Sequence, residues 1–161
     1  MNHAAIADLF GSSCLLSAFG SWVTAQFCKM VIGFCRTRRL DFSYLVSTGG
    51  MPSAHSAMVS GLALAIGLRT GFESPVFALA LAFALVVMFD ASTVRRAAGL
   101  QARLLNQILE ELFKHHHLSE KKLAELLGHT RLEVFMGMVI GILVGLLVHA
   151  AEVLGWRIGS Q

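Results

Sequence analysis

The chain has 161 residues, of which 55% are apolar and 14% are charged, and its formal net charge is +3. An average soluble domain is roughly 25% charged, and a chain this short has too little interior to bury so much apolar surface. The composition therefore excludes a disordered chain, argues against an ordinary water-soluble globule, and predicts a protein of the lipid bilayer.

Four uncharged or nearly uncharged runs are candidates for membrane spans. They cover residues 9–28, 47–68, 74–89 and 134–151, and the third run continues to Val94 past Asp90. About 20 residues at roughly 1.5 Å each cross a hydrocarbon core of about 30 Å. We therefore predict an all-α fold, a polytopic membrane helical bundle of about four transmembrane helices.

A different kind of segment, residues 95–131, separates the third run from the fourth. Its leucines recur every three or four residues between polar side chains, which is typical of an amphipathic helix on the membrane or against the bundle. Three consecutive histidines, residues 115–117, point in different directions around a helix, and we interpret them as an exposed turn. We expect residues 1–161 to form a single domain, with 95–131 as an amphipathic cytoplasmic insertion.

The basic residues are distributed unevenly once the chain crosses the membrane four times. Every lysine and arginine except Arg69 and Arg157 then falls at or near one face. The positive-inside rule makes that face cytoplasmic, or its equivalent in an organelle. We therefore expect an integral protein of a bacterial inner membrane or an organellar membrane, with both termini on the opposite side.

Small residues recur at every fourth position in two of the runs. They are Gly137, Gly141 and Gly145 in the fourth run, and Ala57, Gly61 and Ala65 in the second. Because small side chains let helix backbones approach closely, these residues predict a contact between the two runs. The glycines would serve a dimer equally well.

Snorkelling of cations toward lipid headgroups does not explain why two histidines and two carboxylates, Asp90 and Glu133, stand near span ends. His129 and Glu133 are four residues apart, so on a helix they share a face and the carboxylate can hold the imidazole. That contact fixes the tautomer and makes the other ring nitrogen a better nucleophile. A second histidine, His55, can protonate a leaving oxygen.

Cations in the same region complete the pattern. Lys29, Arg36 and another arginine would hold the non-bridging oxygens of a phosphoryl group and neutralise its developing charge. Two histidines among convergent cations indicate metal-independent phosphoryl transfer. We expect no metal and no other cofactor, because the sequence contains no evident set of three metal ligands.

Three short motifs stand in order along residues 25–150. Lys29 is followed after six residues by Arg36-Thr37, residues 52–55 read Pro-Ser-Ala-His, and His129 is followed after three residues by Glu133. Together they resemble the motifs Lys-x6-Arg-Pro, Pro-Ser-Gly-His and Ser-Arg-x5-His-x3-Asp. These are the motifs of the type 2 phosphatidic acid phosphatase superfamily, which also contains vanadium-dependent haloperoxidases. The similarity is closest to the superfamily's small divergent membrane branch.

The resemblance implies a role for each matching residue. His129 would be the nucleophile that forms a phosphohistidine, Glu133 would orient it, and His55 would be the general acid. The residues that would bind phosphate are Lys29, Arg36 and Ser53.

The chain departs from the superfamily pattern at three positions. Thr37 replaces a proline, Ala54 replaces a glycine, and Leu123 stands where the third motif has its arginine. We expect Arg95 or Arg96, at the end of the third run, to supply the missing cation, with Lys122 as a weaker candidate.

The resemblance implies a membrane phosphatase that acts on a phosphorylated lipid. Because the charge distribution places the motifs at the cytoplasmic leaflet, the expected substrate is phosphatidylglycerophosphate or a related phosphoglycerolipid. One alternative is a polyprenyl (pyro)phosphate phosphatase, and another is a non-catalytic membrane protein or transporter that binds anionic lipid or phosphate. We expect no nucleic-acid partner. The superfamily core usually has six helices, which makes a homodimer a plausible way to complete it.

Overall fold

The computed structural model describes residues 11–38, 50–112 and 128–155, and these ranges are helical without strands. The helices are α2 (Ser13–Thr37), α3 (Ala54–Thr70), α4 (Pro75–Ser92), α5 (Val94–Leu112) and α6 (Arg131–Val153). The prediction of an all-α membrane bundle is confirmed. Of the side chains within the helices, those of Arg36, Arg95 and residues 110–112 are not described.

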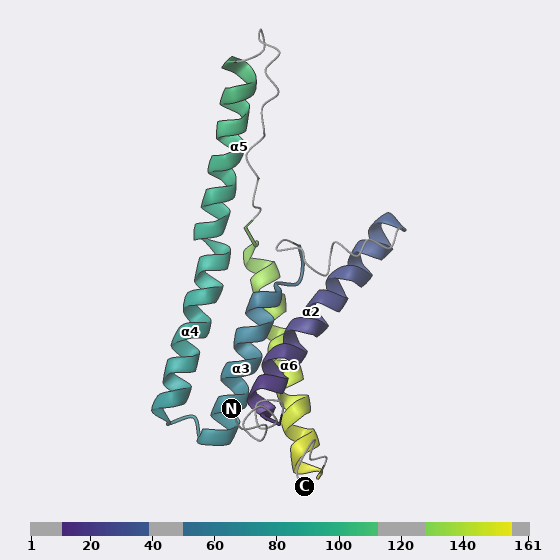
Figure 1. The fold of residues 1–161 in the computed structure, drawn as a ribbon, viewed down its shortest axis with the longest axis vertical. Helices are drawn as coiled ribbons and strands as arrows, with labels where there is room; N and C mark the ends of the chain where they lie inside the picture. The colour runs from purple at the N-terminus through teal and green to yellow at the C-terminus, as the bar shows by residue number, and fades with distance from the viewer. Residues whose placement is uncertain (1–10, 39–49, 113–127, 156–161) are drawn as a thin grey trace, which may run out of the picture.

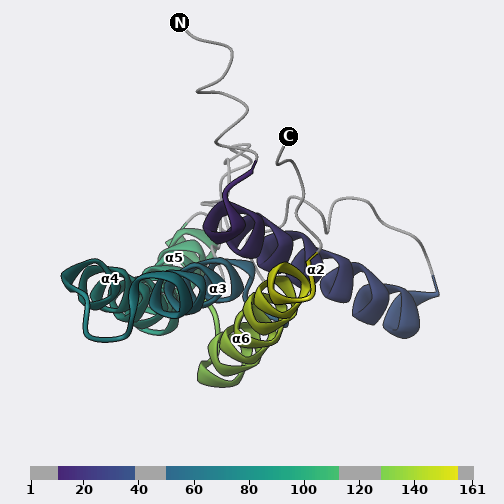
Figure 2. The same ribbon diagram turned by 90° about the horizontal axis from the view of Figure 1, so that it is seen from below.

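The centre of the bundle is α3. It packs against α2, α4 and α6, and α6 also contacts α2 and, less extensively, α4. Figures 1 and 2 show α3 between α4 on one side and α2 and α6 on the other. Consecutive helices of the bundle run in opposite directions, so α3 and α6 begin at the same end (Figure 1).

Three helical stretches are long and apolar enough to cross a membrane, namely Ser13–Cys35, Pro75–Leu109 and Arg131–Val153. We expected four spans, and the difference lies in α3. This helix has 17 residues, so its length is about 26 Å against a hydrocarbon core of roughly 30 Å. Because its neighbours cover it on three sides, α3 contacts protein more than lipid.

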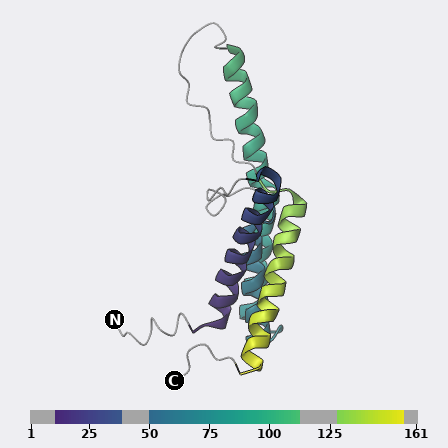
Figure 3. The same cartoon turned by 90° about the vertical axis from the view of Figure 1, so that its right-hand side faces the viewer.

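The third expected span and the amphipathic segment are not separate. No proline or glycine stands between α4 and α5, and only Thr93 departs from helical geometry before α5 begins. Figure 3 shows α5 extending beyond the end of the bundle along the direction of α4. Among the described residues α5 contacts α4 alone, so of the two expected positions, on the membrane or against the bundle, α5 does not take the second. Residues 113–127, with the three histidines, lie outside the described residues.

Local capping explains where three of the helices begin. Ser53, Ser74 and Thr130 precede α3, α4 and α6, and each side-chain oxygen accepts a hydrogen bond from the backbone N–H three residues later. Pro75 takes the first position of α4, where an N–H would have no partner within the helix. Gly71 ends α3 with φ at +87°, a conformation that favours glycine.

The interior of the bundle consists of small side chains, while the large apolar side chains point outward. The two buried clusters are Ala25, Ala54 and Ala57, and Val59, Ala63 and Ala84. Phenylalanine, leucine and valine side chains of α2, α4 and α6 are exposed. Such a surface suits lipid, in which helices associate through close packing of small residues rather than by burying large apolar ones. The chain is therefore an integral membrane protein.

The closest approach of α3 and α6 is at the glycine stripe. A side chain at Gly141 would collide with the Ala57 carbonyl and the Ser60 hydroxyl, and one at Gly137 would collide with the Ser53 carbonyl. The predicted contact between the two runs is confirmed. Because α3 occupies this face of α6, the glycines are not available to a dimer.

Candidate active site

Two helix N-termini meet at one end of the bundle. The Ser53 N–H, just before α3, donates a hydrogen bond of 2.9 Å to the Glu133 carbonyl in the first turn of α6. Both helices therefore direct their first backbone N–H groups, and the positive ends of their dipoles, toward the same region. An anion is favoured in such a place.

His129 is held against this pair of helix ends. Its ring is 3% exposed, its Nδ1 atom lies 3.1 Å from Glu133 Oε2, and its backbone N–H donates at 3.1 Å to the carbonyl of Ala91 in α4. The last contact joins the end of α4 to the start of α6. His129 is therefore held in place through both its ring and its backbone N–H.

Glu133 also closes the cap of α6. Its Oε2 atom accepts from the Thr130 N–H at 3.0 Å, and its own N–H donates to Thr130 Oγ1 at 3.3 Å. We expected His129 and Glu133 to share a face within a helix. Instead α6 begins at Arg131, and the carboxylate turns back across the cap to reach the ring. The two residues are in contact, as their separation of four residues predicts. The contact crosses the cap of α6 and does not run along one face of a helix.

Lys29 reaches the same region from α2. Its side chain is 4% exposed and is close enough to Glu133 for an electrostatic attraction between them. A buried ammonium group in an apolar bundle is costly unless it is partnered. The attraction to Glu133 offsets part of that cost and shows that α2 is a third helix near the site.

The second motif begins α3. Ser53 is 0% exposed and caps the helix, and His55 follows in the first turn, where its side chain is half-buried. Because Ser53 is bonded to Glu133 through its backbone, both residues lie at the same end of the bundle as His129.

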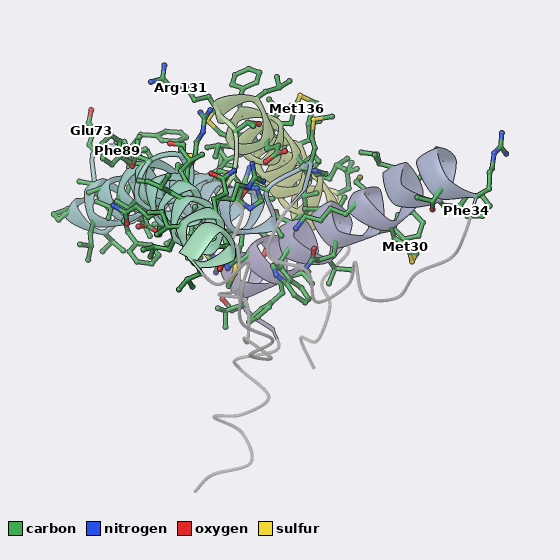
Figure 4. All side chains as sticks on the ribbon, turned by 90° about the horizontal axis from the view of Figure 1, so that it is seen from above. Met30, Phe34, Glu73, Phe89, Arg131 and Met136 are labelled. Carbon is green, nitrogen blue, oxygen red and sulfur yellow. The ribbon has the colours of Figure 1, made fainter. Side chains whose placement is uncertain are left out.

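The expected arginines are placed less directly. Arg36 lies in the last turn of α2, the part of this helix that diverges from the bundle, as Phe34 shows in Figure 4. Arg96 is exposed in the first turn of α5, just beyond Ala91, whose carbonyl contacts His129. The side chains of Arg36 and Arg95 are not described.

Comparison with known proteins identifies the family. Residues 10–144 match the sequence pattern of the Divergent PAP2 family. The chain belongs to this family. It is 41% identical, over 145 residues, to the uncharacterized membrane protein YuiD of Bacillus subtilis (strain 168), an alignment that covers 83% of this chain and 92% of that protein. No solved structure matches the chain.

Sequence reasoning missed two parts of the site in this member of the divergent PAP2 family. Thr130 carries a readable signal, because Thr-x-x-Glu before an apolar run is typical of a capping box. The Ala91 carbonyl carries none, since it acts through the backbone. Among the described residues, no group of three His, Cys, Asp or Glu side chains is placed to hold a metal ion.

Proposed function

We propose that the protein is a membrane lipid phosphatase that works through a phosphohistidine on His129. The observation that carries this proposal is the buried contact between His129 Nδ1 and Glu133 Oε2, made between two helix N-termini and beside Lys29. Membership of the divergent PAP2 family supports the same chemistry.

The first step is attack on phosphorus. When Nδ1 of His129 donates its proton to Glu133, Nε2 carries the lone pair. Nε2 forms the P–N bond while the bond from phosphorus to the lipid oxygen breaks. His55 gives a proton to that oxygen, and the lipid leaves as an alcohol.

The second step releases phosphate. His55, now lacking its proton, takes one from a water molecule, and the resulting hydroxyl attacks phosphorus as the P–N bond breaks. Lys29 and the N–H groups that begin α3 and α6 stabilise the negative charge on the non-bridging oxygens in both steps. Ser53, Arg36 and either Arg95 or Arg96 complete the set of phosphate-binding groups.

The proposed substrate class depends on which side of the membrane the candidate site faces. Lys29, Arg96 and Arg131 lie at the end of the bundle that holds His129, whereas Arg69 lies at the other end of α3. By the positive-inside rule we infer that the first group faces the cytoplasm. We therefore propose a phosphoglycerolipid of the inner leaflet, with phosphatidylglycerophosphate as the first candidate.

The decisive experiment presents a panel of phosphorylated lipids to the purified protein in detergent and measures the phosphate released. We expect His129→Ala and His55→Ala each to lower release by at least about 10²-fold, because a nucleophile or a general acid is lost. The matched control is His149→Ala, which removes a half-buried histidine near the other end of α6. Unchanged release in the first two variants would overturn the mechanism. Preference for a polyprenyl (pyro)phosphate would show that the proposed substrate, a phosphoglycerolipid, is wrong.

Removal of metal ions is a second test of the same chemistry. We expect the protein to release phosphate at an undiminished rate after dialysis against EDTA, since every group in the proposed steps is a protein side chain or a backbone N–H group. The measurement compares release before and after dialysis, with a metal-dependent phosphatase treated in parallel. Loss of activity that returns on addition of Mg²⁺ or Zn²⁺ would contradict the proposed mechanism.

A further inference from the structure

The hydroxyl of Ser53 has a defined hydrogen-bonding direction. Its Oγ atom accepts a hydrogen bond of 2.9 Å from the Ser56 hydroxyl and a longer one of 3.4 Å from the Ser56 N–H. Both serines are 0% exposed. Within the described ranges, no acceptor receives the Ser53 hydroxyl proton.

A hydroxyl group has one proton to donate and two lone pairs with which to accept. Ser56 donates to Ser53 Oγ from its hydroxyl and, over a longer distance, from its N–H, so the proton of Ser53 Oγ is left for another partner. A buried donor without an acceptor is unfavourable. An anion bound between the starts of α3 and α6 would provide that acceptor.

Phosphoryl oxygens suit this arrangement. A phosphomonoester dianion presents oxygens that only accept hydrogen bonds, and bonds to charged acceptors are the stronger ones. The backbone of Ser53 is fixed with respect to Glu133 by a hydrogen bond of 2.9 Å, so its hydroxyl projects from a point that keeps its place relative to His129.

We propose that Ser56 is a positioning residue for phosphate. Its hydroxyl donates to Ser53 Oγ, so the Ser53 hydroxyl donates its own proton to a phosphoryl oxygen. This inference rests on the proposed function. Ser56 touches no substrate in this scheme and acts only through Ser53. Without the Ser56 hydroxyl, one lone pair of Ser53 becomes free and its proton loses the fixed direction.

The test measures inhibition of lipid phosphate release by orthovanadate, which resembles the five-coordinate phosphorus of the reaction. We expect Ser56→Ala to raise the inhibition constant about tenfold, the effect of one hydrogen bond to a charged group. Ser53→Ala should raise it at least as much. Because Ser56 acts through Ser53, the double variant should bind vanadate no more weakly than Ser53→Ala alone.

The matched control is Ser60→Ala, one turn further along α3. Its hydroxyl is also buried, but it donates to the Ser56 carbonyl at 2.6 Å and not to Ser53. We expect vanadate inhibition of this variant to match that of the unaltered protein. If Ser56→Ala behaves like Ser60→Ala, or if the two site substitutions are additive, the inference is wrong while the proposed function stands. If the unaltered protein releases phosphate from no lipid, both are wrong.

Discussion

At the scale of single residues, Glu133 connects the parts of the site. One carboxylate oxygen contacts both the His129 ring and the Thr130 N–H, the backbone carbonyl binds Ser53, and the negative charge attracts Lys29. The residue that closes the cap of α6 is therefore also the residue that holds the imidazole. The helix cap and the proposed chemistry depend on the same carboxylate.

Thr130 tests this connection. We expect Thr130→Ala to destabilise the protein by about 1 kcal/mol through loss of the cap. It should also lower phosphate release by roughly tenfold, because the unsupported carboxylate holds His129 less firmly. Thr130→Ser keeps the hydroxyl and should restore both properties. The measurements are the melting temperature in detergent and the rate of release, and equal activity of the alanine and serine variants would contradict the connection.

Within the candidate site, the contact between His129 and Glu133 could be predicted from the sequence because it depends on a short spacing. The four-residue separation of His129 and Glu133 brings them together whether the intervening chain is helical or forms a cap. The position of Lys29 near that pair depends instead on how α2 crosses α6. The spacing of residues along the chain does not predict this crossing. The divergence of α2 near Arg36 is likewise a property of packing and not of any motif.

At the scale of elements, the position of the site depends on how closely α3 and α6 pack. Gly61 of α3 faces Ser17 and Ser21 of α2 on one side and Gly141 on the other. Three helices therefore meet where side chains are smallest. Because lipid provides no hydrophobic force between helices, this close packing holds the N-termini of α3 and α6 together.

Gly141→Ala should be markedly more harmful than the same change one turn away. An added methyl group at Gly141 meets the Ala57 carbonyl and the Gly61 nitrogen, which cannot move without shifting α3. At Gly145 the nearest atom, at 3.2 Å, belongs to the flexible Leu64 side chain. We expect Gly141→Ala to cost about 1–3 kcal/mol and Gly145→Ala clearly less. Thermal unfolding in detergent measures both, and equal melting temperatures would show that the stripe does not set the packing.

The helices themselves were largely predictable, and their boundaries were not. Long apolar runs mark α2, α4 and α6, because lipid demands such runs of any helix it surrounds. α3 does not need a long apolar run, since protein covers it on three sides and small polar residues such as Ser56 and Ser60 are tolerated there. The continuity of α4 with α5 was missed because a change of composition at Arg95 was interpreted as a change of element.

At the scale of the whole molecule, the bundle has two chemically different ends. His129 and the starts of α3 and α6 lie at one end. At the other, Arg69 donates to Ser13 Oγ at 2.7 Å and lies 3.9 Å from Glu152, which ties α2, α3 and α6 together. The long α4–α5 helix emphasises this polarity, because 35 residues extend about 52 Å and exceed a hydrocarbon core of roughly 30 Å.

The orientation of these ends decides which leaflet supplies the substrate, and a pair of cysteine variants measures it. In a background with the three native cysteines replaced by alanine, Glu73→Cys and Arg131→Cys each place one exposed thiol at opposite ends of the bundle. We expect an impermeant maleimide to label position 73 on intact cells and position 131 only after permeabilisation, since the positive-inside rule predicts that the basic end faces the cytoplasm. The reverse pattern would place His129 at the outer leaflet and favour a polyprenyl diphosphate. Labelling of both positions from one side would contradict a bundle that crosses the membrane.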